Sequence, residues 1–169
     1  MSSDVLVERL YTVEGNLDEL SDLLIRTVDD GASVGFLFPL TSEEAQNYWK
    51  TVLSPEVILL VATCDGRIVG SVQLHVSTKQ NGSHRAEIAK LMTHPAYRRR
   101  GIGRLLMGKA EEIAKAEGKS LIILDTREGD PSNILYISMG YSKAGRIPNY
   151  AKSPNGELAA TIYYYKDNH

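Results

Sequence analysis

The stretch His94-Pro95-Ala96-Tyr97-Arg98-Arg99-Arg100-Gly101-Ile102-Gly103-Arg104 is a cationic loop with two glycines, and an amphipathic run to Gly118 follows it. The first turn of a helix leaves backbone N–H groups free and carries the positive end of the helix dipole. Glycines also let a phosphate approach such a backbone closely. We therefore interpret the stretch as a pyrophosphate-binding loop that opens a helix; the alternative is a basic helix start on a solvated face.

The glycine spacing of this loop decides which kind of phosphate loop it is. It is not a Walker A loop, because no Gly-Lys-Ser/Thr follows, and it is not the dinucleotide fingerprint, because Leu106 stands at the third glycine position. The pattern Arg98-x-x-Gly101-x-Gly103, after a strand-like run and before a helix, resembles the coenzyme A motif of the GCN5-related N-acetyltransferase (GNAT) superfamily. The resemblance implies acetyl-CoA as the cosubstrate.

The composition is that of a globular protein with one domain over residues 1–169. A net charge of −2 gives no global basic field, so we expect no nucleic-acid partner. The single cysteine, Cys64, excludes an internal disulfide framework and fits a reducing compartment, so we expect a cytoplasmic protein. The start Met1-Ser2-Ser3-Asp4 has no signal-sequence pattern, and no apolar run approaches the ~20 residues of a membrane span, so we expect no membrane association.

The hydrophobic periodicity predicts an α/β fold with a mixed central sheet. Strands are predicted over residues 5–11, 57–63, 68–77, 85–92, 120–124, 141–147 and 157–165, with Asp65-Gly66 as a hairpin turn. Helices are predicted over residues 16–30, from a cap at Ser42, over residues 101–117 with a stop at Gly118, and over residues 133–139.

The order of these predicted elements fixes the topology. The first four strands form an antiparallel half, and the strand, helix and strand over residues 85–124 form a parallel unit at the phosphate loop. The sheet is flanked by helices, and this element order is similar to that of the GNAT fold over nearly the whole chain.

Several segments are similar to one branch of that superfamily, the tabtoxin-resistance-type acetyltransferases. They are residues 31–36, 85–87, 90–92, 124–126, 148–150, 154–156 and 162–166. That branch acetylates an amino group of a small amino-acid-like toxin. The resemblance implies direct acetyl transfer to the amine of a small molecule, with toxin or antibiotic resistance as an expected role.

The resemblance also implies that two carboxylates are the acid/base candidates, acting directly or through water. Most amines are protonated at pH 7, so acetyl transfer gains from a general base. Glu87 lies in the strand before the phosphate loop, and Asp125 ends the apolar parallel strand, where open α/β sheets bind ligands. The alternative for Glu87 is an ion pair with Arg85 or Lys90. The alternative for Asp125 is a cap or turn residue.

The resemblance also implies a general acid and a set of coenzyme contacts. Tyr136 occupies the place of the tyrosine that protonates the leaving sulfur, with packing against the coenzyme as the alternative. Many relatives carry Asn six residues earlier, where this chain has Asp130, so Asn133 is the substitute candidate. The backbone of Leu91-Met92-Thr93 is implied to pair with the pantetheine arm. The coenzyme-binding residues implied in this way are Leu91, Met92, Thr93, Arg98, Arg99, Arg100, Gly101, Ile102, Gly103, Arg104, Asn133 and Tyr136.

The acceptor side is less constrained by sequence. Two glycines and small residues over residues 31–36 predict a shaped loop, with Phe36, Leu37 and Phe38 either as pocket walls or packed on the core. The four histidines lack the tight spacing of a metal site, so no metal is expected. The leading hypothesis is a small-molecule N-acetyltransferase, monomeric or homodimeric. The alternatives are a protein or peptide N-acetyltransferase and a non-catalytic acyl-CoA sensor.

Overall fold

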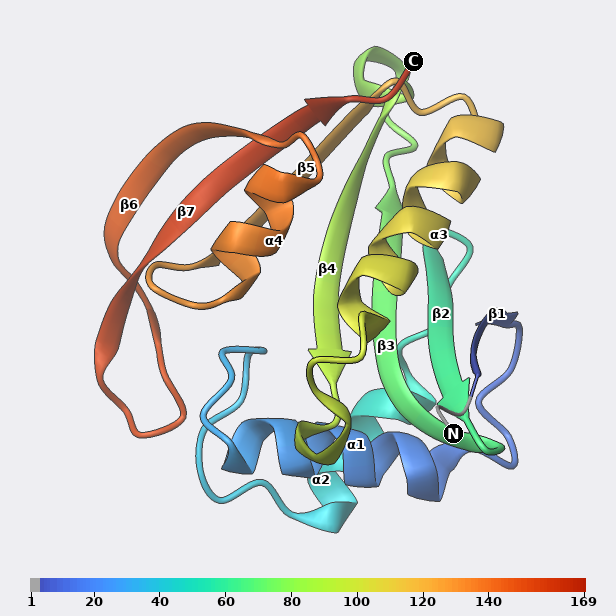
Figure 1. The fold of residues 1–169 in the computed structure, drawn as a ribbon, viewed down its shortest axis with the longest axis vertical. Helices are drawn as coiled ribbons and strands as arrows, with labels where there is room; N and C mark the ends of the chain where they lie inside the picture. The colour runs from blue at the N-terminus through green and yellow to red at the C-terminus, as the bar shows by residue number, and fades with distance from the viewer. Residues whose placement is uncertain (1–3) are drawn as a thin grey trace.

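The computed structural model describes residues 4–169, and the expectation about the first residues therefore rests mainly on positions outside this range. Within the described chain, seven strands form one sheet in the order β1-β2-β3-β4-β5-β7-β6 (Figure 1). Their bounds are Val5–Leu10 (β1), Val57–Cys64 (β2), Arg67–Val76 (β3), Arg85–Thr93 (β4), Leu121–Arg127 (β5), Ser142–Lys152 (β6) and Leu158–Asp167 (β7). All neighbours are antiparallel except β4 and β5, which confirms the predicted mixed sheet.

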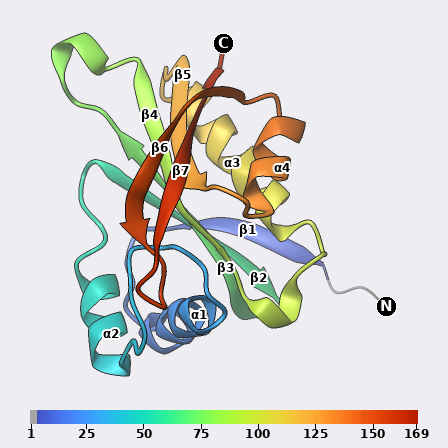
Figure 2. The ribbon, with the colours of Figure 1, turned by 90° about the vertical axis from the view of Figure 1, so that its left-hand side faces the viewer.

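The helices cover both faces of the sheet. Their bounds are Leu17–Asp29 (α1), Ser42–Lys50 (α2), Ile102–Ala116 (α3) and Ser132–Ser138 (α4). Figure 2 shows α1 and α2 on one side of the sheet and α3 and α4 on the other. Two apolar cores follow from this layering: one contains Leu106 and Ala110 of α3, and the other contains Leu20 and Leu24 of α1.

Local chemistry sets most element boundaries. Asp65 and Gly66 both have positive φ, which matches the right-handed twist of the β2–β3 hairpin. Gly118, with φ of 76°, ends α3 as predicted. The predicted cap of α2 was wrong by one residue, because Thr41 rather than Ser42 accepts a hydrogen bond from the Glu44 backbone N–H, at 3.1 Å.

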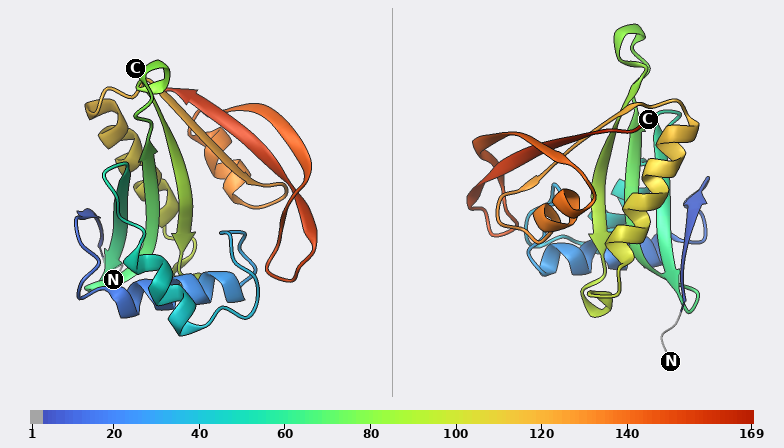
Figure 3. Two further views of the ribbon diagram at one scale, coloured as in Figure 1. Left: turned by 180° about the vertical axis from the view of Figure 1, so that it is seen from behind. Right: turned by 45° about the horizontal axis from the view of Figure 1, so that its top comes forward.

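β6 is longer than the sequence predicted. The expected end at residue 147 reflects Pro148, which cannot donate to a sheet ladder. The pairing of β6 with β7 shifts register between Ile147 and Ala151, where Asn149 has φ of 53°, and then resumes. This bulge carries β6 onward beside the site described below, and the β6–β7 hairpin curls away from the rest of the sheet (Figure 3).

Candidate active site

A cleft of about 1140 Å³ lies where β4 and β5 separate. The two strands pair only from Arg85 with Leu121 to Glu87 with Ile123. Beyond that point they diverge (Figure 1), so within the described chain the β5-facing backbone groups of the rest of β4 have no strand partner. Unpaired strand groups are ready acceptors and donors for an extended ligand that lies alongside β4.

The phosphate loop forms one end of this cleft. Arg99 and Gly101 have φ of 63° and 74°, and this alternation of left-handed residues turns successive backbone N–H groups toward one side. Gly101 is the N-cap of α3, so the free N–H groups of the first helical turn lie beside it. The residues of this loop that line the cleft are Arg98, Arg99, Gly101, Ile102, Gly103 and Arg104, and their contact with the coenzyme stays a prediction.

Three arginines near this loop have distinct environments. Arg98 forms an ion pair with Asp30 at the end of α1, which ties the loop to the helix on the other face. Arg104 donates to the Ser138 hydroxyl at 2.7 Å and ties α3 to α4. Arg100 is exposed, stacks over the Tyr97 ring at 5.1 Å and is not part of the cleft lining. Its predicted contact with the coenzyme is therefore not supported by its position.

Lys90 lies at an interruption of β4 and lines the cleft. Its φ is 57°, and the β3–β4 register shifts between Ser71 and Gln73 opposite this residue. The resulting bulge turns the Lys90 ammonium toward the loop after α1, where it donates to the Val34 carbonyl at 2.7 Å. Burial lowers the pKa of Lys90, whereas Asp125 and then Glu87 oppose that shift. Sequence reasoning considered Lys90 only as a partner of Glu87, because a bulge has no signal in the apolar pattern.

The two candidate carboxylates line the same cleft, as the sequence predicted. Burial raises the pKa of Glu87, the nearby Asp125 charge raises it further, and Lys90 partly offsets both effects. Within the described chain, Glu87 forms no ion pair with Arg85 or Lys90, so that alternative is not observed. Asp125 accepts a hydrogen bond from the Thr161 hydroxyl at 2.6 Å and pairs with Tyr163 within the sheet. It is therefore a strand residue and not a turn residue.

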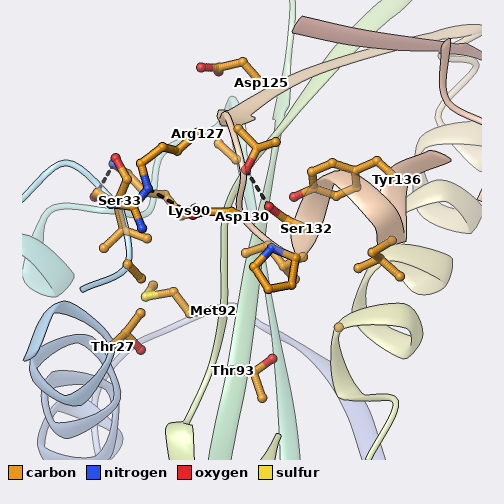
Figure 4. Close-up of a pocket in the computed structure, with 18 of the residues that line it drawn as sticks. Thr27, Ser33, Lys90, Met92, Thr93, Asp125, Arg127, Asp130, Ser132 and Tyr136 are labelled. Atoms are coloured by element: carbon orange, nitrogen blue, oxygen red, sulfur yellow. Dashed lines mark hydrogen bonds and ion pairs between the residues drawn. The ribbon is translucent and has the colours of Figure 1, made fainter. Parts of the chain in front are cut away.

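Tyr136 enters the cleft from α4. In Figure 4 its hydroxyl points toward Ser132, and Lys90 lies on the other side of the view. The ring is 5% exposed and packs against Tyr141 and Tyr164. Burial, followed by the charges of Asp125 and Asp130, raises the pKa of Tyr136 above its usual value of 10. The phenol is therefore protonated at neutral pH and able to donate.

Asn133 does not reach the cleft. Its amide N–H groups donate to the carbonyls of Arg127 and Asp130, both at 2.9 Å, and its oxygen accepts from Tyr164 at 2.8 Å. These bonds fix the turn between β5 and α4, and Asn133 is not among the lining residues. The predicted coenzyme contact is not supported, because the side chain is committed to the turn. By contrast, Leu91, Met92 and Thr93 of β4 line the cleft, and their pairing with the pantetheine arm stays a prediction.

The loop after α1 lines the cleft with its backbone and small residues. Residues 31–35 form this wall, whereas Phe36, Leu37 and Phe38 are not part of the lining. Phe36 stacks edge-on against Tyr48 of α2, so it is packed on the core and is not a pocket wall. His75, Tyr150 and Thr161 also line the cleft and were missed from the sequence. The register between strands places these three residues at the cleft, and the local sequence around them does not indicate that register.

A phosphate-binding helix start beside two diverging parallel strands, with carboxylates between them, is the arrangement of a coenzyme A-dependent acyltransferase. The family model described as the acetyltransferase (GNAT) family matches residues 23–141. The chain belongs to the GNAT acetyltransferase family and is an acetyl-CoA-dependent N-acetyltransferase, EC 2.3.1.-. The expected enzyme is confirmed over the alternative of a sensor.

Two relatives and one solved structure illustrate the likeness. An uncharacterized N-acetyltransferase of Azospirillum brasilense, in the hisH-hisA intergenic region, is 40% identical over 131 residues, covering 75% of this chain and 77% of the relative. An IAA acetyltransferase of the same organism is 27% identical over 137 residues, covering 80% and 87%. The Salmonella typhimurium protein yncA, solved with its cofactor acetyl-CoA, has a TM-score of 0.80 at 15% identity, covering 99% of this chain and 95% of yncA.

The residues of the cleft fit acetyl-CoA. Arg99, Gly101 and the start of α3 offer cationic and N–H groups for a pyrophosphate. The unpaired edge of β4 offers backbone groups for the amides of the pantetheine arm. The position that a Cβ atom would occupy at Gly101 has no heavy atom within 4 Å, so this part of the helix start leaves room for close approach. Among residues 4–169, no helix has the length and apolar character needed to cross a bilayer.

Proposed function

We propose that this N-acetyltransferase transfers the acetyl group to the amine of a small molecule. The observation that carries the proposal is a hydrogen bond between two segments that wall the acceptor side of the cleft. The Phe38 backbone N–H donates to the Pro154 carbonyl at 3.0 Å and joins the loop after α1 to the β6–β7 turn. In Figure 2 this turn lies beside α1 and its following loop. A polypeptide acceptor needs an open groove, and a bridge that joins these two segments favours a small acceptor instead.

The walled part of the cleft has the groups that a small cationic amine needs. Glu87 and Asp125 provide negative charge. Tyr150 lines the β6–β7 side, and its hydroxyl lies 2.9 Å from that of Tyr163. An ammonium group is attracted to both carboxylates and to aromatic faces. Lys90 adds a positive charge nearby, which favours an acceptor that also carries an anionic group.

Acetyl transfer requires three contributions from the chain's own residues: deprotonation of the amine, stabilisation of the oxyanion and protonation of the leaving sulfur. Glu87 accepts a proton from the acceptor nitrogen, and Asp125 holds the ammonium near it before that step. Backbone N–H groups of β4 beyond the bulge stabilise charge on the carbonyl oxygen that is attacked. The Tyr136 hydroxyl donates a proton to the departing sulfur. When bound, acetyl-CoA supplies the thioester that these groups act upon.

The segments that resemble the tabtoxin-resistance-type branch favour an amine of metabolite size as the acceptor. Amino-acid-like compounds, including β-lactam amino-acid toxins, are the first acceptors to test because they combine an amine with an anionic group. Resistance to such a compound is the cellular role that we propose for this activity.

The test is thiol release from acetyl-CoA in the presence of a panel of amines. The panel holds toxin-like β-lactam amino acids, free amino acids, polyamines, aminoglycosides, lysine peptides and peptides with free N-termini. We expect turnover with at least one small amine and a large fall in its rate in Glu87→Gln and Asp125→Asn. Turnover with peptides alone would contradict the proposal and favour the protein acceptor. Acetyl-CoA binding by calorimetry shows that a silent variant still binds its cosubstrate.

A further inference from the structure

His75 and Glu87 face each other at a junction between two hollows. They are register partners on β3 and β4, which places their side chains on the same face of the sheet. In antiparallel pairs, such opposed residues have Cβ atoms about 5 Å apart. Both residues line the large cleft, and both also line a smaller hollow of about 290 Å³ at the β3–β4 end of the molecule. They therefore connect the place of reaction with a second space.

The hydrogen bonds around His75 define its proton-accepting atom. Its Nε2 lies 2.9 Å from the Gln73 side-chain oxygen, and the Gln73 amide nitrogen donates to the Tyr48 hydroxyl at 2.8 Å. An amide oxygen can only accept, so Nε2 carries the hydrogen and Nδ1 keeps its lone pair. Within residues 4–169, Nδ1 has no hydrogen-bond partner. Gln73 is 2% exposed, so this arrangement is held rigidly.

The reaction requires an exit for one proton. An ammonium nitrogen that becomes an amide nitrogen loses two protons; one ends on the departing sulfur, and the other ends in water. Glu87 holds only one proton at a time and must lose it before the next turnover. A neutral imidazole beside it, open to a second hollow, is suited to that transfer.

We propose that His75 Nδ1 takes the proton that Glu87 removes from the acceptor amine and passes it to water in the smaller hollow. The N–H bond of the amine breaks as the O–H bond of Glu87 forms, and that bond breaks in turn as the N–H bond at Nδ1 forms. Water or a dissolved buffer then removes this proton and restores the neutral imidazole. His75 acts through Glu87, so it is a positioning and relay residue. The inference rests on the proposed role of Glu87 in acetylating a small amine.

The charges around His75 agree with this role. Lys90 of β4 acts on it electrostatically. Arg85 and Lys79 line the smaller hollow with it, Asp125 of β5 lines the large cleft with it, and Tyr48 of α2 contacts its partner Gln73. Burial, followed by the Lys90 charge, lowers the pKa of His75, whereas burial and Asp125 raise the pKa of Glu87. The two pKa values therefore shift toward each other, which lowers the free-energy cost of moving a proton between the two groups.

The experiment separates proton transfer from a structural role. His75→Gln keeps hydrogen-bonding capacity next to Gln73 but cannot titrate, and we expect kcat to fall on the order of 10²-fold. His75→Ala leaves space beside the smaller hollow, and added imidazole should restore turnover in proportion to its concentration. His84→Gln is the matched control, because His84 is exposed and lines neither hollow. It should leave kcat unchanged.

The pH profile gives a second readout. Gln73→Glu places a carboxylate at His75 Nε2, which raises the imidazole pKa and should move the acid limb of kcat/KM to higher pH. In the double variant Gln73→Glu with His75→Gln this movement should disappear, which excludes an effect through Glu87 alone. Circular dichroism and thermal unfolding confirm that each variant is folded.

Two results would overturn the inference. If the wild type acetylates a small amine and folded His75→Gln does so within twofold, His75 relays no proton, although the proposed function stands. If His75→Ala is folded and inactive without rescue, and the acid limb stays fixed in Gln73→Glu, His75 has a structural role only. If the wild type acetylates no small amine, the proposed function falls and this inference falls with it.

Discussion

Two glutamates on opposite sides of the molecule have contrasting environments. Glu111 of α3 uses both carboxylate oxygens: one accepts from Lys166 and the other from the Tyr141 hydroxyl, each at 2.8 Å, and its side chain is 14% exposed. Glu87 also lies near a lysine, but it forms no ion pair within the described chain and faces an open cleft. A carboxylate whose oxygens are all satisfied holds elements together, and one left free in a pocket is available for chemistry.

The contrast predicts that Glu87→Gln loses activity and keeps its stability, whereas Glu111→Gln loses stability and keeps its activity. Glu87→Gln should lower kcat/KM about 10²- to 10³-fold, about 3–4 kcal/mol of transition-state stabilisation, because a general base is lost. The midpoint of thermal unfolding should change little, because Glu87 is unpaired. Steady-state thiol release with a small amine measures the first effect. A wild-type rate in folded Glu87→Gln would remove Glu87 from the reaction.

The reciprocal change should cost stability and spare chemistry. Glu111→Gln removes the ionic partner of Lys166, whose ammonium stays partly buried, so we expect unfolding in urea to lose about 2 kcal/mol. Tyr141 remains a donor in this variant, because burial alone still raises its pKa above the usual value. Measured kcat should stay within twofold of the wild type. An unchanged urea midpoint would mean that this cluster does not stabilise the fold.

The two ends of α3 provide a second contrast between site and scaffold. Gly101 and Gly118 have φ of 74° and 76°, and at either residue the position that a Cβ atom would occupy has no heavy atom within 4 Å. Alanine at either position should cost about 1–2 kcal/mol of stability through the same backbone strain. Only Gly101 lines the cleft, so only Gly101→Ala should also weaken acetyl-CoA binding, by about tenfold or about 1.4 kcal/mol. Calorimetric Kd values check this, and equal binding by both variants would argue against phosphate contact at Gly101.

The smallest expected effect is on the pH profile. Glu87 must be ionised to accept a proton, so activity falls as pH drops through its raised pKa. Asp125→Asn removes a negative neighbour, lowers that pKa and should move the acid limb of kcat/KM to lower pH. Lys90→Gln removes a positive neighbour and should move the limb to higher pH. Residual activity of each variant is sufficient for this measurement, and shifts of the opposite sign would contradict the electrostatic assignment.

The parts predicted well from sequence are those whose signals are local. The loop before α3, the Asp65-Gly66 turn and the parallel β4–β5 pair each follow from glycine positions and apolar periods within a short stretch. Both carboxylates were placed in one cleft because strand ends meet at one edge of a sheet.

The parts that were missed depend on register and on competition between partners. The bulge at Lys90 and the pairing of His75 with Glu87 depend on how β3 and β4 align. The residue types at these positions carry no local signal of that alignment. Asn133 has a side chain suited to a ligand, but the nearer carbonyls of its own turn use its N–H groups. Phe36 was a pocket-wall candidate by hydrophobicity, yet contact with Tyr48 satisfies the same tendency away from the cleft.

The bond from the Phe38 N–H to the Pro154 carbonyl joins main-chain atoms only. Every non-proline residue has a backbone N–H donor, and every residue has a backbone carbonyl acceptor. Side chains on both segments can therefore be substituted without removing this hydrogen bond. Ser33 and Tyr150 line the cleft, lie on or near these segments and belong to neither apolar core. In this enzyme, main-chain atoms hold the acceptor pocket together, and side chains line it. Mutant libraries at these positions are therefore a direct route to altered acceptor preference in directed evolution.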